Sequence, residues 1–233
     1  GWFTADLERS LLEGRADVAV HSAKDLPSGL APGLSIAAYL ARADARVGVV
    51  TASGRPLAQF PAGAKVGKSS GRRAGVLPAL YPGVRAVPMR GNVDTRMRKL
   101  DAGEVDGLLL ACAGLDRLSL GHRFTQRLDA LEFVPSPAQG AIALETVTDS
   151  AASRACAPAG DAATRIAVTA ERAVLIGLGG GCLLPLGAWA RIEDGRLVLV
   201  AALVVAGAVR RAEASGAIDE PEALGDLVAA RLR

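Results

Sequence analysis

Short apolar runs that predict strands alternate with amphipathic stretches that predict helices over the first half of the chain. The strands are predicted at residues 16–22, 34–40, 64–70, 85–91 and 105–114. A helix is predicted over 4–14, with Thr4 as its N-cap and Gly14 as its stop. Further helices are predicted from about Arg72, from Asp94 and from Leu115. This alternation indicates an α/β architecture with largely parallel sheets.

The pattern changes from about residue 161. A long helix is predicted over 161–178, and three strands joined by short turns follow it. The strands lie at 186–192, 195–204 and 208–216, with turns at 193–195 and 206–207. A last helix is predicted from Asp219, with Asp219 and Glu222 as a capping pair and Pro221 in the first turn. We therefore expect a separate small α+β domain with an antiparallel sheet, after a boundary within 153–161.

Composition narrows the class of protein without naming its function. Half of the 233 residues are apolar and 22% are charged, which is typical of a folded protein. The longest uninterrupted apolar run, 197–209, is shorter than the roughly 20 residues that a membrane span needs. Net charge is +3 and only 3% of residues are aromatic, so neither a membrane nor a nucleic-acid partner is expected.

The three cysteines and two histidines show no spacing typical of a disulfide framework or a metal site. No metal is therefore expected, and a reducing, cytoplasmic location is favoured. Cys182 alone stands out, because it follows three glycines on a loop after the long helix. A lone cysteine of this kind is either a small buried apolar residue or the carrier of a covalent adduct.

Basic and hydroxyl residues gather where predicted strands give way to helices. These residues are Ser70, Arg72, Arg73, Arg90, Arg96 and Arg117. Free backbone N–H groups at helix starts attract anions, and guanidinium forks suit carboxylate or phosphate. Three successive junctions of this type predict one cleft that faces a multiply anionic ligand. A set of solvated helix starts is the alternative interpretation.

Two further positions carry candidate chemistry. Lys24 and Asp25 follow the strand predicted at 16–22, at the sheet edge where open α/β folds bind ligands. A carboxylate there can stabilise a developing cation or accept a hydrogen bond from an N–H group. A Lys–Asp pair on a solvated turn is the alternative interpretation of the same residues. Gln139 and Gly140 precede another apolar run, which indicates either close backbone approach or an ordinary loop.

In this order, these stretches resemble the porphobilinogen deaminase (hydroxymethylbilane synthase) family of tetrapyrrole and heme biosynthesis. The elements that carry the resemblance are "VHSAKDLP", "GKSSGRRAG", "RGNVDTRMRKLDAGEVDGLLLACAGLDRL", "PAQGAIALE" and "GGGC". They run through nearly the whole chain, and their combination is specific.

The resemblance implies a fold of two α/β domains like type II periplasmic binding proteins, with a small third domain. Domain one would comprise residues 1–40 and 139–158, domain two 41–138, and the cofactor-carrying domain 161–233. The family's first strand has no counterpart here, so we expect the sequence to be truncated at its N-terminus. A monomer is expected.

The resemblance also implies the chemistry. A dipyrromethane cofactor would be held at Cys182 by a thioether bond, and four porphobilinogen molecules would then be added in turn, each losing ammonia to give an azafulvene. Water would release hydroxymethylbilane. Asp25 would be the catalytic carboxylate, and the arginines would pair with substrate and cofactor carboxylates. Lys24, Ser70 and Gln139 would make supporting contacts. Two alternatives stay open: a non-catalytic anion-binding module, and an inactive fragment of the same scaffold.

Overall fold

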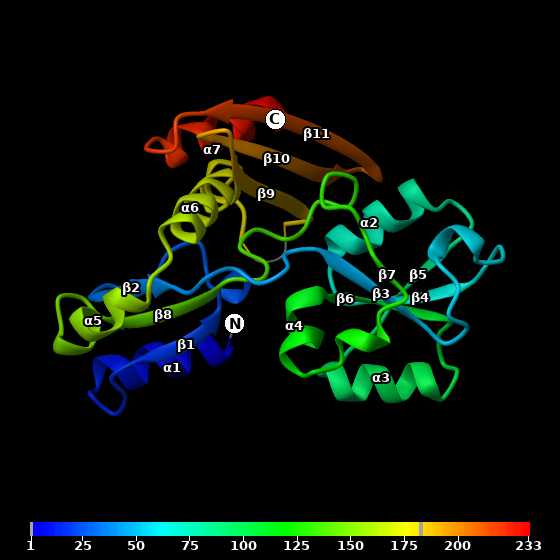
Figure 1. Ribbon diagram of the computed structural model, residues 1–233, viewed down its shortest axis with the longest axis horizontal. Coiled ribbons are helices and arrows are strands. Elements are labelled where there is room, and N and C mark those ends of the chain that lie inside the picture. Colours follow the sequence, from blue (N-terminus) through cyan, green and yellow to red (C-terminus); the bar gives the residue numbers. More distant parts are fainter. Residues whose placement is uncertain (1, 182–183) are drawn as a thin grey trace.

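Three β-sheets with helices packed against them make up the fold (Figure 1). The computed structural model describes residues 2–181 and 184–233. The α/β class and the antiparallel C-terminal sheet predicted from the sequence are confirmed.

The first sheet joins segments that are far apart in the chain. Its order is β1-β8-β2, and both pairings are antiparallel. The strands are β1 (Ala19–Ser22), β2 (Leu34–Tyr39) and β8 (Ile142–Val147). Helix α1 (Trp2–Leu12) packs against the sheet through Leu11, and the short helix α5 (Ala151–Cys156) follows β8. Because α1 already begins at Trp2, the prediction that Thr4 is its N-cap was wrong.

The second sheet has the order β5-β4-β6-β3-β7. Its strands are β3 (Val47–Thr51), β4 (Lys65–Lys68), β5 (Arg85–Pro88), β6 (Gly107–Ala111) and β7 (Gln126–Arg127). Its helices are α2 (Gly71–Leu80), α3 (Val93–Asp101) and α4 (Cys112–Arg117). Apolar residues of α2 and α3 belong to two separate clusters of the core. Helix α4 follows β6 directly, so the helix expected from Leu115 starts three residues earlier.

The prediction of largely parallel sheets was wrong. Among the strands of the described residues, only β4 pairs in parallel, with β5 and β6, whereas β3 is antiparallel to both of its neighbours. Parallel neighbours need a long crossover connection, usually a helix. Here β2 reaches β3 through residues 40–46, and β7 reaches β8 through 128–141, so two connections pass between sheets instead. We call these connections the first and second crossover.

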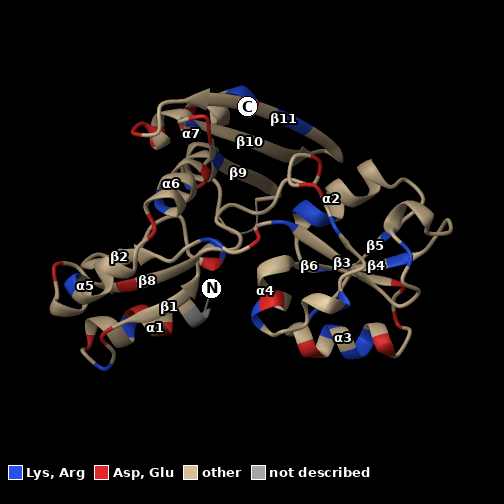
Figure 2. Cartoon of the chain, in the orientation of Figure 1, with Lys and Arg blue, Asp and Glu red and all other residues tan. Residues whose placement is uncertain are grey.

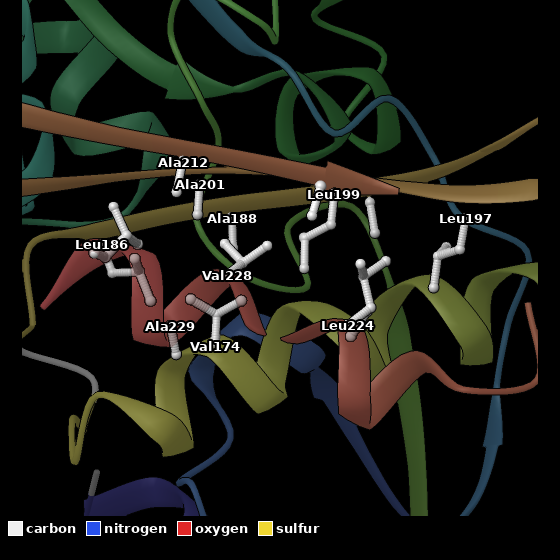
Figure 3. Packing of buried hydrophobic residues seen from close by; sticks show 14 of the residues in the cluster. Val174, Leu186, Ala188, Leu197, Leu199, Ala201, Ala212, Leu224, Val228 and Ala229 are labelled. Atoms are coloured by element: carbon white, nitrogen blue, oxygen red, sulfur yellow. The ribbon is translucent and has the colours of Figure 1, made fainter. Parts of the chain in front are cut away.

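The third sheet is an antiparallel meander of β9 (Leu186–Glu193), β10 (Arg196–Val205) and β11 (Ala208–Gly216). Asp194-Gly195 and Ala206-Gly207 form its two-residue turns, all four with positive φ, as the predicted hairpins require. Figure 3 shows apolar side chains of the sheet packed on α6 (Ala162–Gly177) and α7 (Pro221–Leu232). Pro221 lies in the first turn of α7, but Glu220 takes the N-cap position, so the capping pair predicted at Asp219 was wrong.

A buried carboxylate joins the third sheet to the two crossovers. Glu171 on α6 is fully buried and accepts hydrogen bonds from Arg42 Nη1 at 2.6 Å and Nη2 at 3.0 Å. It also accepts from the backbone N–H groups of Ala138 at 2.6 Å and Ala190 at 2.7 Å. Since Arg42 lies in the first crossover and Ala138 in the second, this one side chain fixes both against α6 and β9.

Candidate active site

The carboxyl ends of the parallel strands β4, β5 and β6 lie at one edge of the second sheet, where α2, α3 and α4 begin. Figure 2 shows basic segments at the start of α2 and along α3. The Ser70 hydroxyl caps α2 by accepting from the N–H of Arg73 at 3.3 Å. Asn92 caps α3 in the same way, as predicted, accepting from the N–H of Thr95 at 2.9 Å.

Arg72 and Arg73 are buried cations without a carboxylate partner among the residues that the structure describes. Arg72 is 3% exposed and Arg73 is 5% exposed. Arg72 donates to the carbonyl of Val134 at 2.6 Å, and Arg73 donates to the carbonyl of Leu109 at 2.8 Å. Burial lowers the pKa of Arg73 to about 10 and also lowers that of Arg72 well below its ordinary value. A polyanion bound here would relieve this desolvated positive charge.

Lys24 and Asp25 lie in a short 3-10 turn (Ala23–Asp25) directly after β1. Lys24 is half-buried, and Asp25 is exposed. The pKa of Lys24 is lowered to about 8, mainly by burial and then by the positive charge of Arg73. Arg72 and Arg96 lower it further, while Asp25 raises it. The structure therefore brings Lys24 of the first sheet into the electrostatic field of the cations of the second sheet.

The other predicted arginines hold different positions. Arg96 is half-buried, donates to the carbonyl of Gly91 at 2.7 Å, and has a pKa that burial lowers. Arg90 is exposed just after β5. Arg117 donates to the carbonyl of Gly140 at 2.8 Å and so ties α4 to the second crossover.

The Gln139 amide is buried and donates to the carbonyls of Ala45 at 2.6 Å and Arg46 at 3.1 Å. Its side chain therefore holds the two crossovers together. Among the residues described here, Gln139 and Arg117 both bond residues of the crossovers. Arg72, Arg73 and Arg96 form a second group, whose positive charges all lower the pKa of Lys24.

Cys182, the predicted attachment point, lies outside the described residues. Its neighbour Gly181 lines a pocket of about 30 Å³ that Lys24 also lines. The remaining walls come from the turn after β1, the second crossover, α6 and the approach to β9. The loop that leads to Cys182 thus comes close to Lys24, next to the cation cluster.

Sequence reasoning missed Arg172, which also lines this pocket. It donates from Nη2 to the carbonyls of Pro27 at 2.6 Å and Ser28 at 3.2 Å. Within the sequence, "AERAV" is one turn of a long helix, and an arginine there is most simply interpreted as solvated. Only the packing of α6 beside the first sheet shows the contact.

These features define an α/β protein with a cluster of buried and half-buried cations at one edge of its second sheet. Within residues 2–181 and 184–233, no cluster of three or more metal-binding side chains occurs. None of the helices described is both long and apolar enough to cross a bilayer.

Comparison with known proteins gives the family. The family model "Porphobilinogen deaminase, dipyromethane cofactor binding domain" matches residues 1–155, and the model of the C-terminal domain matches 165–233. The porphobilinogen deaminase of Desulforudis audaxviator is 46% identical over the whole chain, which covers 76% of that protein. That of Roseiflexus castenholzii is 44% identical, again over the whole chain and 77% of that protein. The chain belongs to the porphobilinogen deaminase family.

Solved structures give weaker matches. The VFT2 domain of BvgS from Bordetella pertussis superposes over 66% of each chain with a TM-score of 0.41 and 20% identity. The amino acid transporter substrate-binding protein AbpA from Streptococcus pneumoniae covers 67% of this chain and 65% of its own, with a TM-score of 0.38 and 15% identity. Similarity at this level supports no inference about the site.

Proposed function

We propose that this chain is a hydroxymethylbilane synthase. It joins four porphobilinogen molecules in turn, with loss of one ammonia each, to a dipyrromethane carried by Cys182, and water then releases the linear tetrapyrrole. The observation that carries the proposal is the cluster of cations, Lys24, Arg72, Arg73 and Arg96, next to the carboxylate of Asp25. Each pyrrole unit brings two carboxylates, so the growing chain is a polyanion that such a cluster suits.

The residues present fit a dipyrromethane. Arg72 and Arg73 are desolvated without a carboxylate partner in the described chain, and Arg73 Nε is a buried donor that lacks an acceptor there. Carboxylates of the cofactor would complete these bonds, with Arg96 and Lys24 as further partners. When bound, the cofactor supplies the free pyrrole end to which each new unit is joined.

Asp25 performs the central step in this proposal. As porphobilinogen loses ammonia, positive charge develops on its pyrrole ring and spreads to the ring N–H. A carboxylate that is already in place stabilises this charge without reorganisation and accepts a hydrogen bond from the ring N–H. Arg90, Arg117, Gln139 and Ser70 contribute to binding in the same proposal.

We also propose that the three sheets correspond to three domains, formed by residues 1–40 with 139–158, 41–138, and 161–233. The sheets draw their strands from these segments. We further propose that the protein works as a monomer in the cytoplasm.

Ammonia release and tetrapyrrole formation from porphobilinogen test the function. The proposal expects both in the unaltered protein, and a loss of at least about a hundredfold in Asp25→Asn. Asp17→Asn, at an exposed position just before β1, is the matched control and should keep its activity. Porphobilinogen binding without ammonia release would instead indicate a non-catalytic anion-binding module.

A further inference from the structure

Helix α6 forms hydrogen bonds with the chain directly after the turn that carries Lys24 and Asp25. Two carbonyls of the segment that follows this turn, those of Pro27 and Ser28, accept from the same guanidinium nitrogen of Arg172, at 2.6 and 3.2 Å. Arg172 also lines the pocket shared by Lys24 and Gly181. Arg172 therefore bonds the segment directly after the turn and also lines the pocket where Lys24 and Gly181 come close together.

Other contacts hold the same turn. Residues 23–25 form a single 3-10 turn closed by one backbone bond, from the N–H of Leu26 to the carbonyl of Ala23. Leu26 is buried in a cluster that includes Val168, one helical turn before Arg172 on α6. Asp25 itself is exposed. The N–H of Ala23 also donates to the carbonyl of Ala141 in the second crossover, at 3.0 Å. The turn is therefore held at its start by the second crossover, and beyond its end by the apolar contact and the Arg172 hydrogen bonds from α6, which we call the clamp.

We propose that Arg172 is a positioning residue for the reaction proposed above. By holding the carbonyls of Pro27 and Ser28, it fixes the turn that carries Lys24 and Asp25 beside the pocket that Gly181 lines. Each new unit joins the free pyrrole end of the attached chain, so a carboxylate that is held in place meets every new junction in the same geometry. The inference rests on the proposed function for its role in catalysis, but the clamp itself can be measured separately.

The same helix offers a matched control. Arg165 lies two turns earlier on α6 and donates from Nη2 to the carbonyl of Ala37 at 2.8 Å, with its guanidinium 5.5 Å from the centre of the Tyr39 ring. Both arginines therefore bond backbone carbonyls of residues 27–37 from the same helix. Arg165 reaches β2 rather than the turn with Asp25, so its loss should weaken the packing of α6 without releasing that turn.

The acetylation rate of Lys24 measures how often the turn opens and exposes this amine to the reagent. The chain has only four lysines, Lys24, Lys65, Lys68 and Lys99. The acetylation rate of each can be followed by peptide mass spectrometry in the folded protein. In Arg172→Met, we expect Lys24 to react about tenfold faster, because the charged clamp no longer opposes local opening. The other three lysines are internal references and should not change, and Arg165→Met should leave Lys24 as it is in the unaltered protein.

Attachment of pyrrole units gives the functional readout. Incubation with porphobilinogen, followed by intact mass, should show slower gain of mass in Arg172→Met than in Arg165→Met. Arg172→Lys keeps one charged donor and should restore both readouts in large part, which a loss of general stability would not predict. It also serves as the second variant if Arg172→Met folds poorly.

Three results would overturn the inference. These are an unchanged Lys24 rate in folded Arg172→Met, an equal rise in Arg165→Met, and a released turn with normal attachment. Failure of the proposed function looks different, because the unaltered protein would then gain no mass from porphobilinogen. The catalytic role of Arg172 would fall with it, while the Lys24 rates would still report the clamp.

Discussion

Replacing Glu171 with glutamine tests the most connected contact of the fold. Its Oε1 accepts from Arg42 Nη1 and the N–H of Ala190, and its Oε2 accepts from Arg42 Nη2 and the N–H of Ala138. An amide has the same shape, but its NH2 group would face two donors whichever way it turned. Glu171→Gln therefore loses a negative charge. It also places the amide NH2 group against one Arg42 nitrogen and one backbone N–H, which are both donors.

The magnitude follows from the burial of the pair. The Glu171 side chain is fully buried and that of Arg42 is 12% exposed, so the variant leaves a largely desolvated guanidinium without its counter-charge. Removing one partner of such a pair destabilises a protein by about 3–5 kcal/mol. For a chain of this length, each kcal/mol lowers Tm by about 2–4 °C. We expect Tm to fall by about 6–20 °C in Glu171→Gln.

Scanning calorimetry at pH 7 measures the effect, with Lys99→Met as the control. Lys99 pairs with Glu104 at 3.7 Å, and the two side chains are 39% and 56% exposed. Loss of such a surface pair changes stability by less than about 1 kcal/mol. If Glu171→Gln lowered Tm no more than Lys99→Met does, Glu171 would not be the junction of the crossovers that the structure describes.

Three further predictions concern the site and the crossovers. The pKa of Lys24 is lowered to about 8 from an ordinary 10.5, so the unfolded chain holds a proton that the folded protein loses between these values. The stability of the unloaded protein should therefore rise with pH over this window, and Lys24→Met should raise the unfolding free energy at pH 7 by about 2 kcal/mol and flatten the rise. Urea unfolding at several pH values checks this, and an unchanged slope would argue against it. Ala138 has a φ of 60°, which is strained for a side chain, so Ala138→Gly should be neutral or stabilising by up to about 1 kcal/mol in the same assay. Gly140 has a φ of 93°, and a Cβ there would lie 2.5 Å from the carbonyl oxygen of Ala43, so Gly140→Ala should destabilise by more than about 1 kcal/mol. Equal effects of the two crossover substitutions would contradict this account of the loop.

The sequence predicts best where local chemistry decides the structure. The two-residue turn Asp194-Gly195 needs two residues that tolerate positive φ, and its residues show this without tertiary information. The caps at Ser70 and Asn92 are likewise local, since each side chain bonds an N–H three residues on. These elements follow the predictions closely.

Strand direction and pair formation depend on contacts between distant segments. Strand β3 was not predicted, because its five buried residues form a short run without alternation. It enters from another sheet through the first crossover, and its antiparallel direction is defined by pairing with β6 and β7, which lie far along the chain. No local pattern shows that Glu171 bonds Arg42, 129 residues earlier, or that Arg172 reaches Pro27.

For the candidate site, the sequence located the strand–helix junctions but not their environment. Arg72 and Arg73 were expected to face a cleft, and the structure buries both side chains with their guanidinium groups on backbone carbonyls. Burial depends on residues 109 and 134, which no pattern around "GRRAG" indicates. The roles of these arginines, of Asp25 and of Cys182 stay predictions.

The intact mass of the purified full chain, before and after incubation with porphobilinogen, tests the central claim most directly. We expect a covalent dipyrromethane that is absent from Cys182→Ser and retained in Cys156→Ser, whose cysteine is the half-buried last residue of α5. Further pyrrole units should then add in turn to the loaded protein. An unchanged mass in the unaltered protein, or an adduct that persists in Cys182→Ser, would contradict the account.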